Sequence, residues 1–270
     1  MTRTTESVPA LLRECLAAHN HDGQFLAEDL LTRNGYAPEV GEKYVYGAGT
    51  IPILLIAHTD TVHRAPPSEL FFDPTKEVLW SPNGLGADDR AGVYGIAALL
   101  EKGYRPHVLF TDEEETGGHG AQSAAWNLAA PPVRLLVQLD RRGATDAVYY
   151  SCDNARLRRW ITRRGFTTAS GSFTDISILM PEWGIAGVNL STGYYREHTT
   201  SEHLRMDELR ATLGKVEGML RRPPKDRFEY VDENWRFQDK SDRAETYEED
   251  RKSTRLNSSH IQKSRMPSSA

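Results

Sequence analysis

Four runs of apolar residues constrain this chain most, because each leads to histidine or carboxylate side chains. The runs cover residues 53–57, 107–110, 135–139 and 185–190, and they lead to His58, to Glu114 and Glu115, to Asp140 and, after a longer loop, to His198. Continuous apolar runs of this length are typical of central parallel strands covered by helices on both faces. Sites in open α/β sheets form at the carboxyl ends of such strands. We therefore expect these residues to converge at one edge of a sheet, where histidine and carboxylate together can bind metal ions.

Acidic residues are unusually dense at two of the predicted loops. Residues 112–115 are all acidic and follow the strand that ends at Phe110, and Asp88 and Asp89 stand in a glycine-marked loop that opens a helix. Adjacent carboxylates repel one another and cost desolvation energy, which bound cations would relieve. Two simpler interpretations stay open. Residues 112–115 could be a solvated acidic loop, and Asp88 and Asp89 could be favoured by the dipole of a helix N-terminus.

The alternation of strands and helices predicts the fold class. Helices are predicted at residues 11–17, 23–34, 88–100, 153–164, 175–180 (ended by Pro181) and 201–220, with an outer strand at 43–46 and a hairpin at 71–80. A strand followed by a helix, repeated along the chain, favours a sheet with helices on both faces. We therefore predict an α/β protein, a three-layer αβα sandwich with a mostly parallel central sheet.

Length and composition narrow the choice of function. The 270 residues are 39% hydrophobic and carry a net charge of −5, which fits one α/β domain and gives no support for binding to nucleic acid. We expect no signal peptide and no membrane-spanning segment, because no stretch is sufficiently long and apolar. Cys15 and Cys152 form no CxxC pair and are expected to be reduced, which favours the cytoplasm.

Five short motifs occur in an order that is specific in combination. They are His58-Thr59-Asp60, residues 86–92 (Gly-Ala-Asp-Asp-Arg-Ala-Gly), residues 114–117 (Glu-Glu-Thr-Gly), Asp140, and residues 198–202 (His-Thr-Thr-Ser-Glu). Between residues 52 and 204 the chain therefore resembles the co-catalytic dizinc exopeptidases, the superfamily of bacterial leucyl aminopeptidase, peptidase T and carboxypeptidase G. Each motif alone is a weak signal, but five in this order are a strong one.

The resemblance implies two zinc ions that share one bridging carboxylate. By position, the first ion is held by His58 and Asp140, the second by Glu115 and His198, and both by Asp88. His203 lies close to His198 in sequence and is the alternative ligand. A cis peptide bond between Asp88 and Asp89 is also implied. Because the set is rich in oxygen, cobalt or manganese could replace zinc.

The resemblance also implies the catalytic residues. Asp60 is expected to orient His58, and Glu114 is expected to be the general base, because it precedes a ligand without being one. Asp175 falls where many relatives have a Gly-Thr-Asp element near the substrate, although Phe173 departs from that pattern.

Only about 35 residues separate Asp140 from Asp175, too few for the lid domain of about a hundred residues that some relatives insert. We therefore expect a lidless catalytic domain at residues 1–222 and a loosely packed, charged tail at 223–249, whose Phe228, Tyr230 and Trp235 could dock on the domain. Residues 250–270 resemble a translated sequencing adapter and are not expected to be native. Without a lid histidine, Tyr194 or Tyr195 would supply the hydrogen bond to the oxyanion.

The sequence therefore predicts a metal-dependent exopeptidase acting on peptides, most simply an aminopeptidase. An N-acyl amino acid deacylase or a carboxypeptidase would use the same site but need a cation for the free carboxylate of its substrate, for which Arg90 or Arg196 could serve. A non-catalytic binding module on the same fold is the alternative from another class. The oligomeric state stays open.

Overall fold

The predicted apolar runs form neighbouring strands at the centre of an eight-stranded sheet. The computed structural model describes residues 8–233, and its large sheet has the order β1-β2-β6-β3-β7-β10-β8-β9. The strands are β1 (Glu39–Gly41), β2 (Tyr44–Gly47), β3 (Ile51–His58), β6 (Pro106–Thr111), β7 (Leu136–Arg141), β8 (Asp146–Val148), β9 (Thr167–Ala169) and β10 (Gly187–Ser191). The central strands β6, β3, β7 and β10 are mutually parallel, whereas β1, β2 and β8 each make an antiparallel pair.

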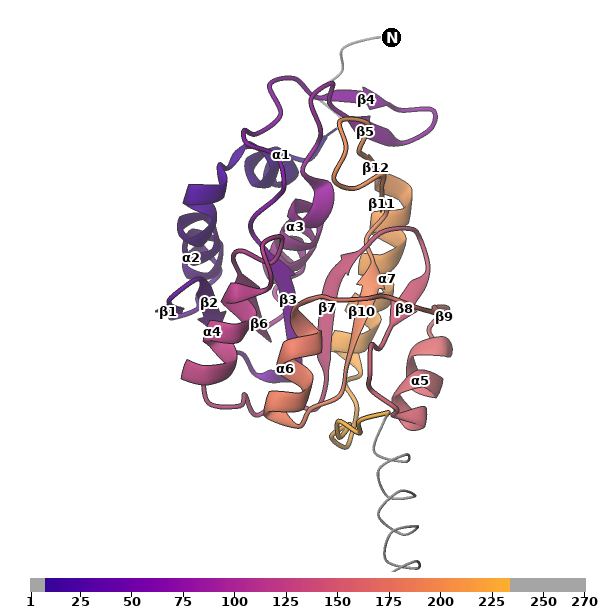
Figure 1. The fold of residues 1–270 in the computed structure, drawn as a ribbon. Coiled ribbons are helices and arrows are strands. Elements are labelled where there is room, and N and C mark those ends of the chain that lie inside the picture. Colours follow the sequence, from indigo (N-terminus) through magenta and orange to yellow (C-terminus); the bar gives the residue numbers. More distant parts are fainter. Residues whose placement is uncertain (1–7, 234–270) are drawn as a thin grey trace, which may run out of the picture. The chain divides into compact units, whose positions relative to one another are not determined.

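Helices cover both faces of this sheet, which gives the predicted three layers. Figure 1 shows the sheet between a layer that contains α4 and α6 and a layer that contains α3 and α7. The helices are α1 (Ala10–Ala17), the short η2 (Asn20–Asp22), α2 (Gly23–Arg33), α3 (Ala87–Glu101), α4 (His119–Asn127), α5 (Ala155–Thr162), α6 (Asp175–Trp183) and α7 (Met206–Arg221). The α/β class and the mostly parallel central sheet are confirmed.

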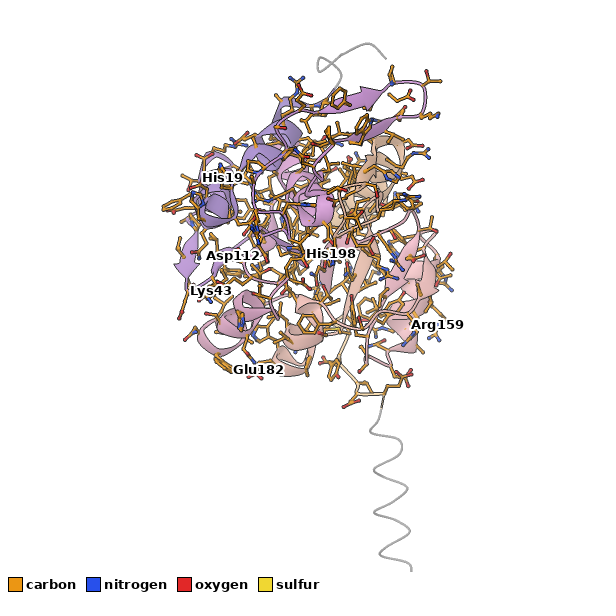
Figure 2. All side chains as sticks on the ribbon, turned by 45° about the horizontal axis from the view of Figure 1, so that its top comes forward. His19, Lys43, Asp112, Arg159, Glu182 and His198 are labelled. Carbon is orange, nitrogen blue, oxygen red and sulfur yellow. The ribbon has the colours of Figure 1, made fainter. Side chains whose placement is uncertain are left out.

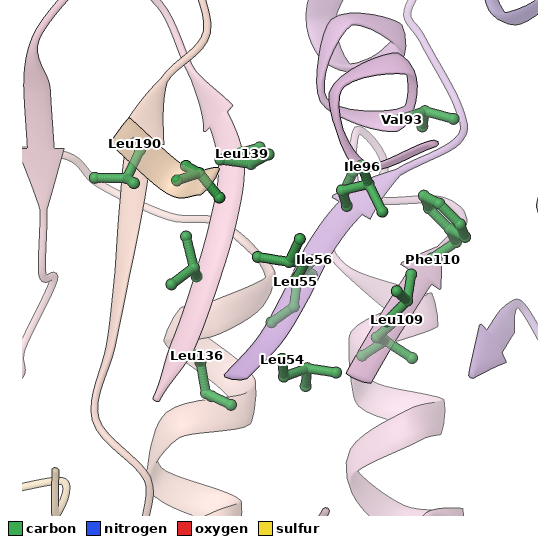
Figure 3. Close-up of a cluster of buried hydrophobic side chains, with 14 of the residues drawn as sticks. Leu54, Leu55, Ile56, Val93, Ile96, Leu109, Phe110, Leu136, Leu139 and Leu190 are labelled. Atoms are coloured by element: carbon green, nitrogen blue, oxygen red, sulfur yellow. The ribbon is translucent and has the colours of Figure 1, made fainter. Parts of the chain in front are cut away.

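The core lies where α3 crosses the central strands. Figure 3 shows Leu54, Leu55 and Ile56 of β3 beside Leu109 of β6 and Ile96 of α3, and all five are fully buried. Removing such a side chain from water contributes about 1.5–3 kcal/mol. Because this core fixes the strands relative to one another, it also fixes the residues at their carboxyl ends.

A second sheet of four short strands was not predicted as a unit. It has the order β11-β12-β5-β4, with β4 (Phe71–Asp73), β5 (Val78–Trp80), β11 (Tyr194–Tyr195) and β12 (His203–Arg205). The predicted hairpin supplies β4 and β5, and His203 of β12 pairs with Trp80 of β5. This pairing brings the segment that follows His198 beside the segment that precedes Asp88.

Two predicted helix boundaries need correction. The last helix begins at Met206 rather than near Ser201, because residues 203–205 form β12. Pro181 does not end its helix: α6 continues to Trp183. Two residues of the predicted tail pack on the domain: Phe228 is buried and its backbone N–H donates to the backbone oxygen of Arg134, and Tyr230 packs against the same core. Trp235 and residues 234–249 of the predicted tail lie outside the described residues.

No helix among residues 8–233 is both long enough and apolar enough to cross a membrane.

Gly92 lies where α3 comes close to β7. A Cβ atom at this position would lie 2.1 Å from the carbonyl oxygen of Leu139 and 2.5 Å from Oδ1 of Asp89. The Gly92→Ala variant should therefore lose about 1–3 kcal/mol of unfolding free energy through overpacking. Gly218→Ala in α7 is the matched control, because a Cβ there meets nothing within 4 Å. Urea unfolding of both variants tests this, and equal stabilities would contradict the proposed close packing.

Candidate metal centre

The structure brings the predicted ligands together at the carboxyl ends of the central strands. His58 ends β3, Asp140 lies near the end of β7, Glu114 and Glu115 follow β6, Asp88 lies at the start of α3, and His198 follows β11. Figure 2 labels His198 near the middle of the view, with Asp112 and Lys43 farther to one side. These elements are far apart in sequence, so the side chains meet only because the parallel strands end at one edge.

Asp88 is the residue that connects the two histidines. Its Oδ1 lies 3.3 Å from Nε2 of His58, and its Oδ2 lies 3.2 Å from Nε2 of His198. The two oxygens therefore face different imidazoles. His58 also lies 3.5 Å from Oδ1 of Asp140, and His198 lies 2.9 Å from Oε2 of Glu115.

Asp140 is held from several directions. Its Oδ2 accepts hydrogen bonds from Thr174 at 2.6 Å and from Gln138 at 3.0 Å, and its Oδ1 accepts one from the hydroxyl of Tyr194 at 3.2 Å. The backbone N–H of Asp140 donates to the side chain of Asn189. The carboxylate is thereby fixed with Oδ1 toward His58.

Asp60 orients both His58 and the two glutamates. Nδ1 of His58 lies 3.0 Å from the backbone oxygen of Asp60 and 3.3 Å from its Oδ1. The same carboxylate accepts the backbone N–H groups of Glu114 and Glu115, each at 3.1 Å. One buried aspartate thus links the imidazole to the loop after β6, which supports its predicted orienting role.

The peptide bond between Asp88 and Asp89 is cis, as the resemblance implies. Asp89 is fully buried, and it accepts the backbone N–H groups of His58 at 3.3 Å and Gly92 at 3.0 Å. A ligand atom of Asp89 also lies within 4.8 Å of ligand atoms of His58 and Asp140. We favour Asp88 as the shared ligand, because the Asp89 carboxylate is committed to backbone donors.

Burial and mutual repulsion make ionisation of the two glutamates unfavourable in the absence of a cation. Burial raises the pKa of Glu114 to about 9, and Asp140 and Asp175 add to the rise against the opposing effect of His58. Burial also raises the pKa of Glu115 to about 7, with a further contribution from Asp88.

The histidines respond to the same excess of negative charge. A hydrogen bond to Asp88 is the main cause that raises the pKa of His198 to about 9. Burial would lower the pKa of His58, but hydrogen bonds to Asp140, Asp60 and Asp88 hold it well above its usual value. The site therefore attracts positive charge.

Divalent cations fit this set of donors. Ligands bonded to one zinc ion at about 2.0–2.1 Å lie about 3.3 Å apart across a tetrahedral angle, close to the separations within each histidine–carboxylate group. Ligand atoms of His58, Asp88 and Glu115 all lie within 4.8 Å of one another. Oε1 of Glu115 is buried without a hydrogen-bond partner, a state that coordination would relieve.

Several predicted contacts need correction, because the structure uses these side chains elsewhere. Asp175 is fully buried and accepts a hydrogen bond from Thr111, so it offers no surface to a substrate. The hydroxyl of Tyr195 donates to Glu208 at 2.6 Å and so points to α7. The hydroxyl of Tyr194 donates to Asp140 from a buried position.

The two predicted arginines also differ in their placement. Arg90 is buried, and its guanidinium donates to the backbone oxygens of Cys15 and His19. It is therefore not available to bind the carboxylate of a substrate. Arg196 is exposed in the loop just before His198. His203, the alternative ligand, stacks on Tyr195 in the small sheet, so of these two histidines it is His198 that faces Asp88.

Thr174, Gln138 and Asn189 are site residues that were not predicted. They hold Asp140 through hydrogen bonds, but a lone threonine or amide in a sequence carries no signal of such a contact. Glu202 belongs to the last of the five motifs, and no role was predicted for it. It is buried, and its carboxylate accepts the backbone N–H of Asp88 at 2.9 Å.

Comparison with known proteins gives a match in structure but not in sequence. No family model matches the chain, and no curated protein matches it. Aminopeptidase PepT from Bacillus cereus has a TM-score of 0.63 at 14% identity, over 77% of this chain and 96% of that one. A tripeptidase from Staphylococcus aureus has a TM-score of 0.64 at 15% identity, over 78% and 96%.

A third solved structure extends the likeness to the archaea. The TET aminopeptidase from a marine-sediment thaumarchaeon has a TM-score of 0.64 at 12% identity, over 80% of this chain and 96% of that one. Agreement along most of both chains requires a shared arrangement of helices and strands, although few residues are identical. The chain therefore has the same fold as these two aminopeptidases and this tripeptidase.

Proposed function

We propose that this protein is a metal-dependent aminopeptidase with a dinuclear site. The observation that carries the proposal is the position of Asp88, whose two oxygens face the two histidines separately at 3.3 Å and 3.2 Å. A carboxylate in this position can bridge two ions. The fold shared with the aminopeptidases supports the same conclusion.

His58 and Asp140 would hold one ion, Glu115 and His198 the other, and Asp88 both. Two divalent ions in such a site lower the pKa of a water molecule and polarise the carbonyl of the peptide bond. Zinc suits two histidines with three carboxylates, and cobalt or manganese is compatible with the same ligands. Three carboxylates and a hydroxide balance the four positive charges, which limits the cost of burying the site.

Glu114 is the proposed general base. Its Oε2 lies 4.0 Å from Nε2 of His58, and its side chain is 13% exposed, so it borders the ligands while remaining open to water. Glu114 takes a proton from the attacking water and delivers it to the leaving amine. Asp60 fixes the geometry of this step through its hydrogen bonds to the backbones of Glu114 and Glu115.

The fold shared with two aminopeptidases favours an aminopeptidase over a carboxypeptidase or deacylase. Those two activities need a cation near the site for the free carboxylate of the substrate. Arg90 is buried against α1 and the residues that follow it, so it does not serve, whereas Arg196 is exposed just before His198 and is the remaining candidate. We propose an open site in a lidless domain, because the chain between Asp140 and Asp175 forms β8, α5 and β9.

A comparison of two substrate classes tests the activity. Aminoacyl-anilides present a free amine beside the bond to be broken, whereas N-acyl amino acids present a free carboxylate. We expect turnover of the anilides to exceed that of the N-acyl amino acids by at least about tenfold in kcat/KM, which corresponds to about 1.4 kcal/mol. Activity on N-acyl amino acids alone would contradict the aminopeptidase proposal.

The free, buried thiols of Cys15 and Cys152 suit a reducing compartment, and we propose that the protein acts in the cytoplasm.

A further inference from the structure

Glu202 is a buried carboxylate that has no role in the proposed chemistry. Glu202 is 1% exposed, and hydrogen-bond donors surround both oxygens of its carboxylate. Oε2 accepts the backbone N–H groups of Leu85 at 3.2 Å and Gly86 at 2.7 Å, and it lies 3.0 Å from Nε2 of His63. Oε1 accepts the backbone N–H of Asp88 at 2.9 Å. Burying a charge is costly unless its partners are well placed, and here four partners are present.

The segment that carries Glu202 reaches Asp88 at a second point. His198 lies four residues earlier, and its Nε2 is 3.2 Å from Oδ2 of Asp88. Residues 199–202 form a turn, in which the backbone N–H of Glu202 donates to the backbone oxygen of Thr199 at 3.2 Å. Asp88 is therefore held twice by one short segment, at its backbone by Glu202 and at its carboxylate by His198.

Stabilisation of the start of α3 would be the simpler role for Glu202, because an anion is favourable at a helix N-terminus. The donors are the backbone N–H groups of Leu85, of the N-cap residue Gly86 and of Asp88, so the hydrogen bonds that stabilise the start of α3 also hold the backbone of the shared ligand. Fixing that backbone fixes the direction of the Asp88 side chain. Other residues anchor His58, Asp140 and Glu115: Asp60 contacts His58 and the backbone N–H of Glu115, and Thr174 contacts Asp140.

We propose that Glu202 is a positioning residue that directs Asp88 toward the ion held by Glu115 and His198. This inference rests on the proposed dinuclear site and adds to it a difference between the two ions. The ion held by Glu115 and His198 depends on Glu202 more, because Glu202 fixes the backbone of Asp88 and belongs to the same short turn as His198. The ion held by His58 and Asp140 has independent anchors and depends on Glu202 less.

The test is a zinc titration of the purified protein against a chromophoric chelator, with the wild type compared with Glu202→Gln. The amide keeps the size of the side chain but turns one acceptor into a donor that faces backbone N–H groups. We expect one of the two affinities to fall about 10–100-fold, as for other residues that support metal ligands, and the other to change by less than about threefold. Titration with Co²⁺ should show a changed visible spectrum for the weakened ion only.

Thr212→Val is the matched control, because it removes a buried 2.8 Å hydrogen bond to the backbone oxygen of Ser191 without touching residues 85–88. Both of its affinities should stay at the wild-type values. If Glu202→Gln does not fold, Glu202→Asp carries the test, because it keeps the charge but draws it back by one methylene, and the same ion should be weakened.

Equal affinities in the wild type and the folded Glu202 variant would overturn the inference, and so would an equal weakening of both ions. A wild type that binds fewer than two ions would instead overturn the proposed function, so the two failures are distinguishable.

Discussion

Glu114→Gln is expected to keep its full metal content and to lose turnover by a factor of about 10²–10⁴. The amide has nearly the same size as the carboxylate, but it does not take a proton from water. Glu114 is not among the proposed ligands, and its backbone N–H remains free to donate to Asp60. The ligands should therefore stay in place while the proton transfer is lost.

Glu113→Gln is the matched control for this prediction. Glu113 is the neighbouring glutamate, but its carboxylate pairs with Lys43 at 2.5 Å. We expect its kcat to stay within about threefold of the wild type, since surface ion pairs contribute at most about 1 kcal/mol. Elemental analysis and steady-state kinetics on an aminoacyl-anilide measure both variants. An unchanged rate in Glu114→Gln would remove Glu114 from the mechanism, and a loss of metal would make it a ligand.

Removal of the metal ions is expected to lower the melting temperature by about 10 °C or more. A ligand at 1,000 times its dissociation constant stabilises the native state by about 4 kcal/mol, and each kcal/mol corresponds to about 2–4 °C for a domain of this size. Removal also leaves Asp88, Glu115 and Asp140 close together without their counter-charge, so the acidic cluster should destabilise the metal-free protein.

Calorimetry before and after dialysis against a chelator measures this effect, and zinc added back should restore the original melting temperature. Asp88→Ala is the control, because it lacks the shared carboxylate and should show a much smaller shift. Elemental analysis of protein purified without added metal should give two ions per chain. If chelation leaves the wild-type melting temperature unchanged, the site holds no ions under native conditions.

The supporting roles of Glu202 and Thr174 were beyond prediction, because their contacts join segments distant in the sequence. Glu202 and Asp88 are held together by β12 and β5, strands of three residues each that are stable only when paired. Thr174 reaches Asp140 because α6 begins beside the end of β7. The apolar residues at 201–220 recur with helical spacing, so the sequence did not indicate the strand β12. Proline usually ends a helix, but Pro181 lies within α6.

The sequence alone determined the central strands and the order of the candidate ligands. A buried parallel strand requires an unbroken apolar run, and the polar residues that follow such runs must lie at the same edge of the sheet. Only the tertiary structure decided that His198 rather than His203 faces Asp88, that Arg90 is buried, and that Glu202 holds the backbone of Asp88. Those outcomes depend on contacts between segments that are distant in the sequence, and the stability of such contacts cannot be read from the pattern of neighbouring residues.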